Sequence, residues 1–219
     1  LCEAVVANGA DFGISVDPDV DRLALICENG QPFGEEYTLV SVADYLLSRI
    51  YNEALETGKS IDEIAAPYQM VTSSNLSSSR ALRDVTEQYG GEYCTAAVGE
   101  VNVTTKMREA GALIGGEGNG GVIYPALHYG RDAMVGVALF LTNLANKKMK
   151  VSELRATYPE YVIAKNKIEL SDSVLIDRIL DEMKNVFANE DVNTIDGVKI
   201  SFESRKEWVH LRRSNTEPI

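Results

Sequence analysis

Apolar and polar residues follow two different periods along the first part of the chain. Residues 12–16 and 23–27 are short apolar runs separated by the polar stretch 17–22, which predicts two strands joined by an acidic loop. From residue 37 to 56 apolar side chains recur every three or four positions, which predicts a helix, and Gly58 is a typical helix end. The chain therefore opens with two strands and a long helix.

After Gly58, strand-like and helix-like segments alternate. The spacing predicts strands at 64–72, 92–97 and 112–115, and helices at 80–89, 101–110 and 133–146. This alternation indicates an α/β fold with a mixed, mostly parallel sheet and flanking helices. A connector should then extend to Pro159.

The last 60 residues have a different pattern. From residue 160 the sequence predicts a strand, an amphipathic helix at 174–188 and a hairpin around Asp196 and Gly197. We expect this part to form a separate small α+β C-terminal domain.

Composition excludes some classes of function. The 219 residues are 45% hydrophobic, and 33 acidic against 21 basic residues give a net charge of −12, which opposes general binding to nucleic acid or to an anionic membrane. No apolar run approaches the roughly 20 residues of a membrane span. The widely spaced Cys2, Cys27 and Cys94 match no ligand pattern and favour a reducing, cytoplasmic setting.

The acidic loop reads Asp-Pro-Asp-Val-Asp-Arg. Asp17, Asp19 and Asp21 alternate, so their carboxylates can fall on one side of an extended loop, where they repel unless a cation lies among them. Hard oxygen ligands with open positions suit Mg²⁺ acting on phosphate. Arg22 fits this chemistry because its guanidinium matches two phosphate oxygens.

Two other interpretations of this loop are open. An EF-hand would place Glu28 at its twelfth position, but that loop needs glycine where Arg22 stands, and the flanks are strand-like rather than helical. The loop could also be a solvated acidic turn that begins at Asp17-Pro18.

Residues 115–121 read Gly-Gly-Glu-Gly-Asn-Gly-Gly. The glycines let a ligand approach the backbone, and Glu117 with Asn119 supplies acceptors and donors suited to sugar hydroxyls. The spacing matches neither a Walker A loop nor GxGxxG, and a flexible turn is the alternative.

Two further groups carry possible chemistry. His128 and Arg131 lie just before the predicted helix that Asp132 would cap, so they could reach the same cleft; His128 could transfer protons or be a satisfied structural residue. The terminal run after Leu211 offers guanidinium, hydroxyl and amide donors for a phosphate, or forms a capped turn. Its candidate residues are Arg212, Ser214, Asn215 and Thr216.

In this order the three loops resemble those of the phosphohexomutase superfamily of phosphoglucomutases, phosphomannomutases and phosphoglucosamine mutases, with archaeal-type phosphoglucosamine mutases most similar. The resemblance implies residues 1–35 as the end of the second domain, 36–158 as the third and 159–219 as a truncated fourth. It also implies Mg²⁺ on Asp17, Asp19 and Asp21, with Arg22 beside the transferred phosphoryl group. Residues 98–103 add a weaker match.

For the sugar, the resemblance implies that Glu117 and Asn119 bind hydroxyls, and we expect Arg131 to bind the substrate as well. Many members carry histidine where Gly121 stands, and we expect His128 to take over part of its acid/base role. The fourth-domain loop, with Arg212 and the three polar residues Ser214, Asn215 and Thr216, is implied to bind phosphate.

The same resemblance implies a reaction for the whole protein. A phosphoserine would interconvert hexose or hexosamine 6-phosphate and 1-phosphate through a bisphosphate, but its Thr-Ala-Ser-His-Asn-Pro-like loop does not occur here. Both ends of the chain look cut, so we expect the N-terminal domains to be missing and this portion to be inactive alone. A non-catalytic sugar- or Ca²⁺-binding module and an Asp-based phosphatase are the rival functions.

Overall fold

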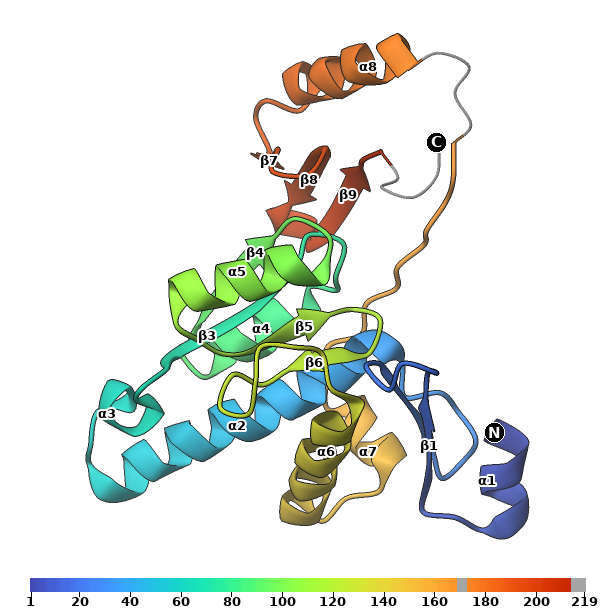
Figure 1. Ribbon diagram of the computed structural model, residues 1–219, viewed down its shortest axis with the longest axis vertical. Coiled ribbons are helices and arrows are strands. Elements are labelled where there is room, and N and C mark those ends of the chain that lie inside the picture. The colour runs from blue at the N-terminus through green and yellow to red at the C-terminus, as the bar shows by residue number, and fades with distance from the viewer. Residues whose placement is uncertain (169–172, 214–219) are drawn as a thin grey trace. The chain divides into compact units, whose positions relative to one another are not determined.

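The computed structural model describes residues 1–168 and 173–213, and the chain forms two compact units, Leu1–Tyr161 and Val162–Ile219 (Figure 1). Among the described residues, no helix is long and apolar enough to cross a bilayer. Cys2, Cys27 and Cys94 are free thiols.

The first unit begins with a helix and an antiparallel hairpin, namely α1 (Cys2–Asn8), β1 (Phe12–Val16) and β2 (Leu23–Cys27). Both predicted strands are confirmed. Val16 pairs with Leu23, so the strand ends beside the acidic loop are held together. The loop at 17–22 is therefore fixed at both of its ends.

A four-stranded sheet forms the centre of this unit. Its strand order is β4-β3-β5-β6, with β3 parallel to both β4 and β5, and β5 antiparallel to β6. The strands are β3 (Gln69–Asn75), β4 (Glu92–Ala96), β5 (Ala112–Glu117) and β6 (Gly121–Ile123). The predicted mostly parallel sheet is confirmed.

Helices cover both faces of the sheet. Met70 and Val71 are adjacent in β3 and so point to opposite faces. Met70 belongs to the main core with α2 and α4, whereas Val71 packs with Val103 and Met107 of α5. The bounds are α2 (Glu35–Thr57), α4 (Ala81–Gln88), α5 (Glu100–Ala110) and α6 (Ala133–Lys147).

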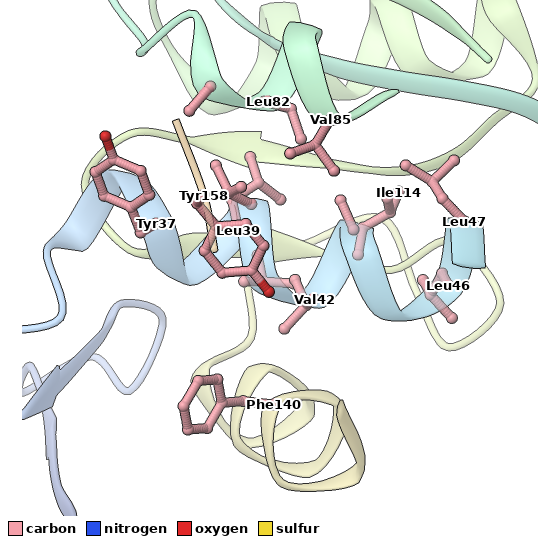
Figure 2. Packing of buried hydrophobic residues seen from close by; sticks show 14 of the residues in the cluster. Tyr37, Leu39, Val42, Leu46, Leu47, Leu82, Val85, Ile114, Phe140 and Tyr158 are labelled. Carbon is pink, nitrogen blue, oxygen red and sulfur yellow. The ribbon is translucent and has the colours of Figure 1, made fainter. Parts of the chain in front are cut away.

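Helix α2 is the centre of the main core. Figure 2 shows Leu82 and Val85 of α4 on one side of α2 and Phe140 of α6 on the other. Buried positions therefore occur all round the first four turns of α2, and even Asp44 is only 5% exposed. Asp44 accepts hydrogen bonds from the hydroxyls of Tyr89 (2.7 Å) and Tyr158 (3.0 Å).

Several segments differ from the sequence prediction. The predicted strand at 64–72 is wrong at its start, where Ser60 and Glu63 form a capping box that begins α3 (Ile61–Ala65). The predicted connector before Pro159 contains α7 (Val151–Ala156). Strand β6 is an addition that the prediction lacked.

In its described residues, the second unit contains one α-helix and a three-stranded antiparallel sheet of order β7-β8-β9. The hairpin around Asp196 and Gly197 and the small α+β domain are thus confirmed, whereas residues 160–168 form no strand. The elements are α8 (Ser173–Val186), β7 (Asp191–Asn193), β8 (Val198–Phe202), the 3-10 turn η1 (Glu203–Arg205) and β9 (Glu207–Leu211).

The first unit extends to Tyr161 because that residue is held by hydrogen bonds. The Tyr161 backbone N–H donates to the Tyr37 hydroxyl (2.9 Å), and its own hydroxyl donates to Asp84 (2.6 Å). The Tyr37 hydroxyl also donates to the Pro159 carbonyl (2.8 Å). These contacts attach the segment after α7 to α2 and α4.

Candidate functional site

The acidic loop between β1 and β2 is organised by Asp17. Its Oδ1 accepts the backbone N–H groups of Asp21 and Arg22 (both 3.1 Å), and its Oδ2 accepts Arg22 Nε (2.8 Å). Desolvation works against the charged form, but the hydrogen bonds from Arg22 and Asp21 prevail and lower the pKa of Asp17 to about 2. Asp17 is therefore ionised at neutral pH.

Asp21 is in a different environment. Its Oδ2 lies 2.6 Å from a terminal nitrogen of Arg131, while its buried Oδ1 lies 3.5 Å from Arg22 Nε and makes no hydrogen bond within the described residues. Burial raises the pKa of Asp21, as does the neighbouring Asp17, and the charge of Arg131 opposes this rise. Asp19 is exposed.

The loop also contains a strained residue. Val20 has a φ of 57°, in the left-handed region that β-branched residues rarely adopt. Its carbonyl accepts the N–H of Ala133, the first residue of α6 (3.2 Å). The turn is thus tied to α6, and backbone strain of this kind tends to occur at functional sites.

The predicted magnesium ligands are not gathered into one set in this arrangement. Within residues 1–168 and 173–213, no three His, Cys, Asp or Glu side chains lie close enough to hold a metal ion. The donor chemistry fits, since Asp17 and Asp21 offer hard carboxylate oxygens and Asp21 Oδ1 makes no hydrogen bond within the described residues. Binding Mg²⁺ here would require Asp17 and Asp21 to share or release their arginine partners, so the ligand set stays a prediction.

The glycine-rich loop is the turn of the β5–β6 hairpin, with Glu117 as the last residue of β5. Glu117 is only 5% exposed. Its Oε1 accepts Asn75 Nδ2 (2.7 Å) and the Gly99 N–H (3.3 Å), and its Oε2 accepts a terminal nitrogen of Arg131 (2.7 Å). A carboxylate has about four acceptor positions, so one remains for a ligand.

Asn119 stabilises the turn itself. Its Oδ1 accepts the N–H of Gly121 (3.2 Å), and the Gly118 N–H donates to the Ser78 hydroxyl (3.1 Å). The loop is thus an ordered turn rather than a flexible one. The carboxamide nitrogen of Asn119 is the part of the side chain left to meet a sugar hydroxyl.

The acidic loop and the β5–β6 turn lie directly beside each other. Arg22 forms an antiparallel bridge with Gly121, and the Leu23 N–H donates to the Gly120 carbonyl (3.0 Å). Arg131 joins them again, because its guanidinium contacts both Asp21 and Glu117. Two loops that are almost 100 residues apart in the sequence thus form one site.

His128 lies in the loop before α6, and both of its ring nitrogens have partners. Nδ1 accepts the Gly130 N–H (3.1 Å), and Nε2 lies 3.0 Å from Asp132 Oδ2. Asp132 is the N-cap of α6, as predicted, and accepts the N–H groups of Met134 (2.8 Å) and Val135 (3.0 Å). Desolvation opposes ionisation, but these bonds and His128 lower the pKa of Asp132.

Two residues of the site were not singled out from the sequence. Glu100 accepts the Arg131 N–H (3.0 Å) and lies 3.4 Å from Arg131 Nε; it falls within the weaker family match at 98–103. Asn75 ends β3 next to the end of β5. The carboxyl ends of parallel strands are where open α/β sheets place ligands, and that rule could have identified Asn75.

In the second unit, the predicted phosphate loop is only partly described. Arg212 directly follows β9 and donates to the Arg213 carbonyl (3.1 Å), while Arg213 pairs with Asp177 (2.7 Å). Ser214, Asn215 and Thr216 lie outside the described residues.

Comparison with known proteins identifies the family. Residues 39–161, more than half of the chain, match the phosphoglucomutase/phosphomannomutase α/β/α domain III. The chain belongs to the phosphohexomutase superfamily. The hairpin turn that carries Glu117 and Asn119 lies within the matched domain, as does Arg131.

Individual relatives agree with this assignment. The chain is 30% identical over its whole length to a probable phosphoglucosamine mutase of Methanopyrus kandleri, and 34% identical over 99% of its length to a phosphoglucomutase/phosphomannomutase of Thermococcus kodakarensis. It spans 44% and 43% of those two proteins, which is less than half of each.

A solved structure gives the same result. A phosphoglucomutase/phosphomannomutase family protein of Burkholderia thailandensis superposes with a TM-score of 0.74 at 25% identity, over 99% of this chain and 43% of its own. The mixed α/β fold is therefore that of the family.

Proposed function

We propose that this chain is the metal- and sugar-binding portion of a Mg²⁺-dependent mutase that interconverts hexose or hexosamine 6-phosphate and 1-phosphate. The observation that carries the proposal is the meeting of the acidic loop and the Glu117 turn at Arg131, inside a chain of this family. Relatives named phosphoglucosamine mutase favour a hexosamine phosphate as the substrate. A cytoplasmic location is part of this proposal.

Each loop of the site would have its own role in this reaction. Asp17, Asp19 and Asp21 would hold Mg²⁺, which supplies charge neutralisation for a phosphoryl group in transfer. Arg22 would contact that group. Glu117, through its remaining acceptor position, and Asn119, through its amide nitrogen, would orient the sugar hydroxyls.

The non-reacting phosphate would be bound in the second unit by the predicted loop of Arg212, Ser214, Asn215 and Thr216. The phosphoserine donor would come from a part of the protein beyond these 219 residues, which contain no Thr-Ala-Ser-His-Asn-Pro-like run. The chain by itself should therefore bind substrate without turning it over.

Calorimetry on the chain tests this proposal. Glucosamine 6-phosphate with Mg²⁺ should bind more tightly than free glucosamine, and Arg212→Ala should weaken the phosphate-dependent binding by about tenfold or more. Arg205→Ala is a matched control, because Arg205 is an exposed arginine of the same unit paired with Glu207.

Two results would overturn the proposal. Tight binding of free sugar or of Ca²⁺ without phosphate would favour the binding-module rival. Release of inorganic phosphate by the chain alone would favour the phosphatase.

A further inference from the structure

Gly121 lies directly beneath the side chain of Arg131. A Cβ at Gly121 would lie 2.5 Å from Arg131 Cδ, 3.2 Å from Cγ and 3.1 Å from Asn119 Oδ1. The φ angle of Gly121 is not positive, so its backbone conformation is open to any residue. Glycine is therefore needed at this position for space rather than for backbone freedom.

Arg131 uses that space to join two loops. One terminal nitrogen contacts Glu117 Oε2 (2.7 Å), the other contacts Asp21 Oδ2 (2.6 Å), and the side chain is only 19% exposed. Both ends of the guanidinium fork are therefore engaged within the protein. A bidentate grip on a substrate phosphate would need these same nitrogens.

Glu117 is held from two directions as a result. Asn75 and the Gly99 N–H fix its Oε1, and Arg131 fixes its Oε2. Without Arg131 the Oε2 side would lose its charged partner, while the carboxylate would stay buried. Burial without a partner is unfavourable for a carboxylate, so its orientation would change.

We propose that Arg131 is a positioning residue, not a substrate ligand: it fixes the orientation of Glu117 and ties it to Asp21, and the missing side chain at Gly121 makes this possible. A bulky side chain at position 121 would overlap the Arg131 side chain as it lies here, so the two exclude each other. The effect on sugar binding rests on the proposed function, but the contact between Gly121, Arg131 and Glu117 does not.

A double-mutant cycle on unfolding of the chain tests the steric part. With Arg131 in place, Gly121→Ala should raise the unfolding equilibrium constant by about tenfold or more, because the added methyl group overpacks the site. In the Arg131→Ala background, where Cγ and Cδ are gone, the same substitution should raise this constant by less than about threefold. Gly13→Ala is the control: its Cβ would lie 2.6 Å from Val5, so its effect should be the same with either residue at 131. Equal effects of Gly121→Ala in both backgrounds would overturn the proposal.

Nuclear magnetic resonance tests the positioning part in variants that keep a long side chain at 131. The Asn75 side-chain amide and the Gly99 amide report on Glu117, because both donate to its Oε1. Both resonances should shift in Arg131→Met and shift less in Arg131→Lys, which keeps one charged donor. Resonances that stay unmoved in Arg131→Met would refute positioning.

Binding of glucosamine 6-phosphate separates this inference from the proposed function. Arg131→Met should weaken binding about as much as Glu117→Gln does, and the double variant should be no weaker than either single one. Additive losses would instead make Arg131 an independent ligand. If the unsubstituted chain binds no sugar phosphate, the proposed function fails, while the cycle and the resonances still decide the role of Arg131.

Discussion

Single residues at the site differ in ways that the sequence spacing did not indicate. Asp17, Asp19 and Asp21 alternate equally, yet Asp17 orders its own loop, Asp19 is exposed and Asp21 pairs with Arg131. Residue type and spacing alone predict a set of three equivalent carboxylates. Asp17 has local partners in Asp21 and Arg22, but Asp21 pairs with Arg131, more than 100 positions away, and no local pattern contains that information.

Asp17 should make stability depend on pH in the acidic range. Its pKa falls from 3.8 to about 2 on folding. Its contribution to the free energy of unfolding is therefore present above pH 4 and is lost as the pH falls from about 4 to about 2. Urea midpoints measured between pH 5 and pH 2 should show a smaller decline for Asp17→Asn than for the unsubstituted chain. Parallel declines would exclude this role for Asp17.

His128 should carry its proton on one particular nitrogen. The Gly130 N–H can only donate, so Nδ1 must present a lone pair, and Nε2–H then donates to Asp132. Nitrogen-15 spectra at pH 8 should show the Nε2–H tautomer. The opposite tautomer would mean that the ring is free of Gly130 and better placed for the proton transfer expected from the sequence.

At the scale of elements, segments with a clear apolar pattern of their own were predicted correctly, whereas segments that depend on strand pairing or on capping were not. Strands β1 and β2 and helix α2 follow clear periodicities. Strand β6 has three residues and exists because it pairs with β5, so its own sequence is not decisive. The predicted strand at 64–72 included Ile64 and Ala65, which instead end α3, a helix begun by the capping box of Ser60 and Glu63.

The start of α6 offers a test of element stability. Asp132 caps two backbone N–H groups, so Asp132→Ala should lower the free energy of unfolding by about 1 kcal/mol. Asp132→Asn keeps an acceptor at the N-cap and should lower the free energy of unfolding clearly less than Asp132→Ala does. Thermal or urea denaturation measures both, and equal losses would show that the charge contact with His128 matters more than the cap.

At the scale of the whole molecule, one buried carboxylate links distant parts of the first unit. Asp44 of α2 accepts from Tyr89, which follows α4, and from Tyr158, and it pairs with Lys147 at the end of α6 (3.2 Å). Burial and Asp44 together raise the pKa of both phenols. These polar groups satisfy one another inside an otherwise apolar core.

Asp44→Ala should therefore destabilise the first unit. Removing it leaves the buried Tyr158 hydroxyl and the half-buried Tyr89 hydroxyl without this acceptor, and we expect a loss of about 2–4 kcal/mol in the free energy of unfolding. Glu87→Ala is the control, since Glu87 forms a surface pair with Arg83 (2.7 Å) and should change stability by less than about 0.5 kcal/mol. Similar losses in urea titrations of the two variants would contradict the structural role of Asp44.

The central position of α2 has a consequence for synthesis in the cell. Its covering partners include Phe140 of α6 and Arg155 of α7, whose guanidinium lies over the Tyr37 ring. They are made about 100 residues after α2, which at roughly 5–20 residues per second is a delay of about 5–20 seconds. During that delay an apolar helix emerges from the ribosome with much of its surface uncovered. Nascent chains of this protein should therefore be clients of chaperones that bind apolar segments until α6 and α7 have been made.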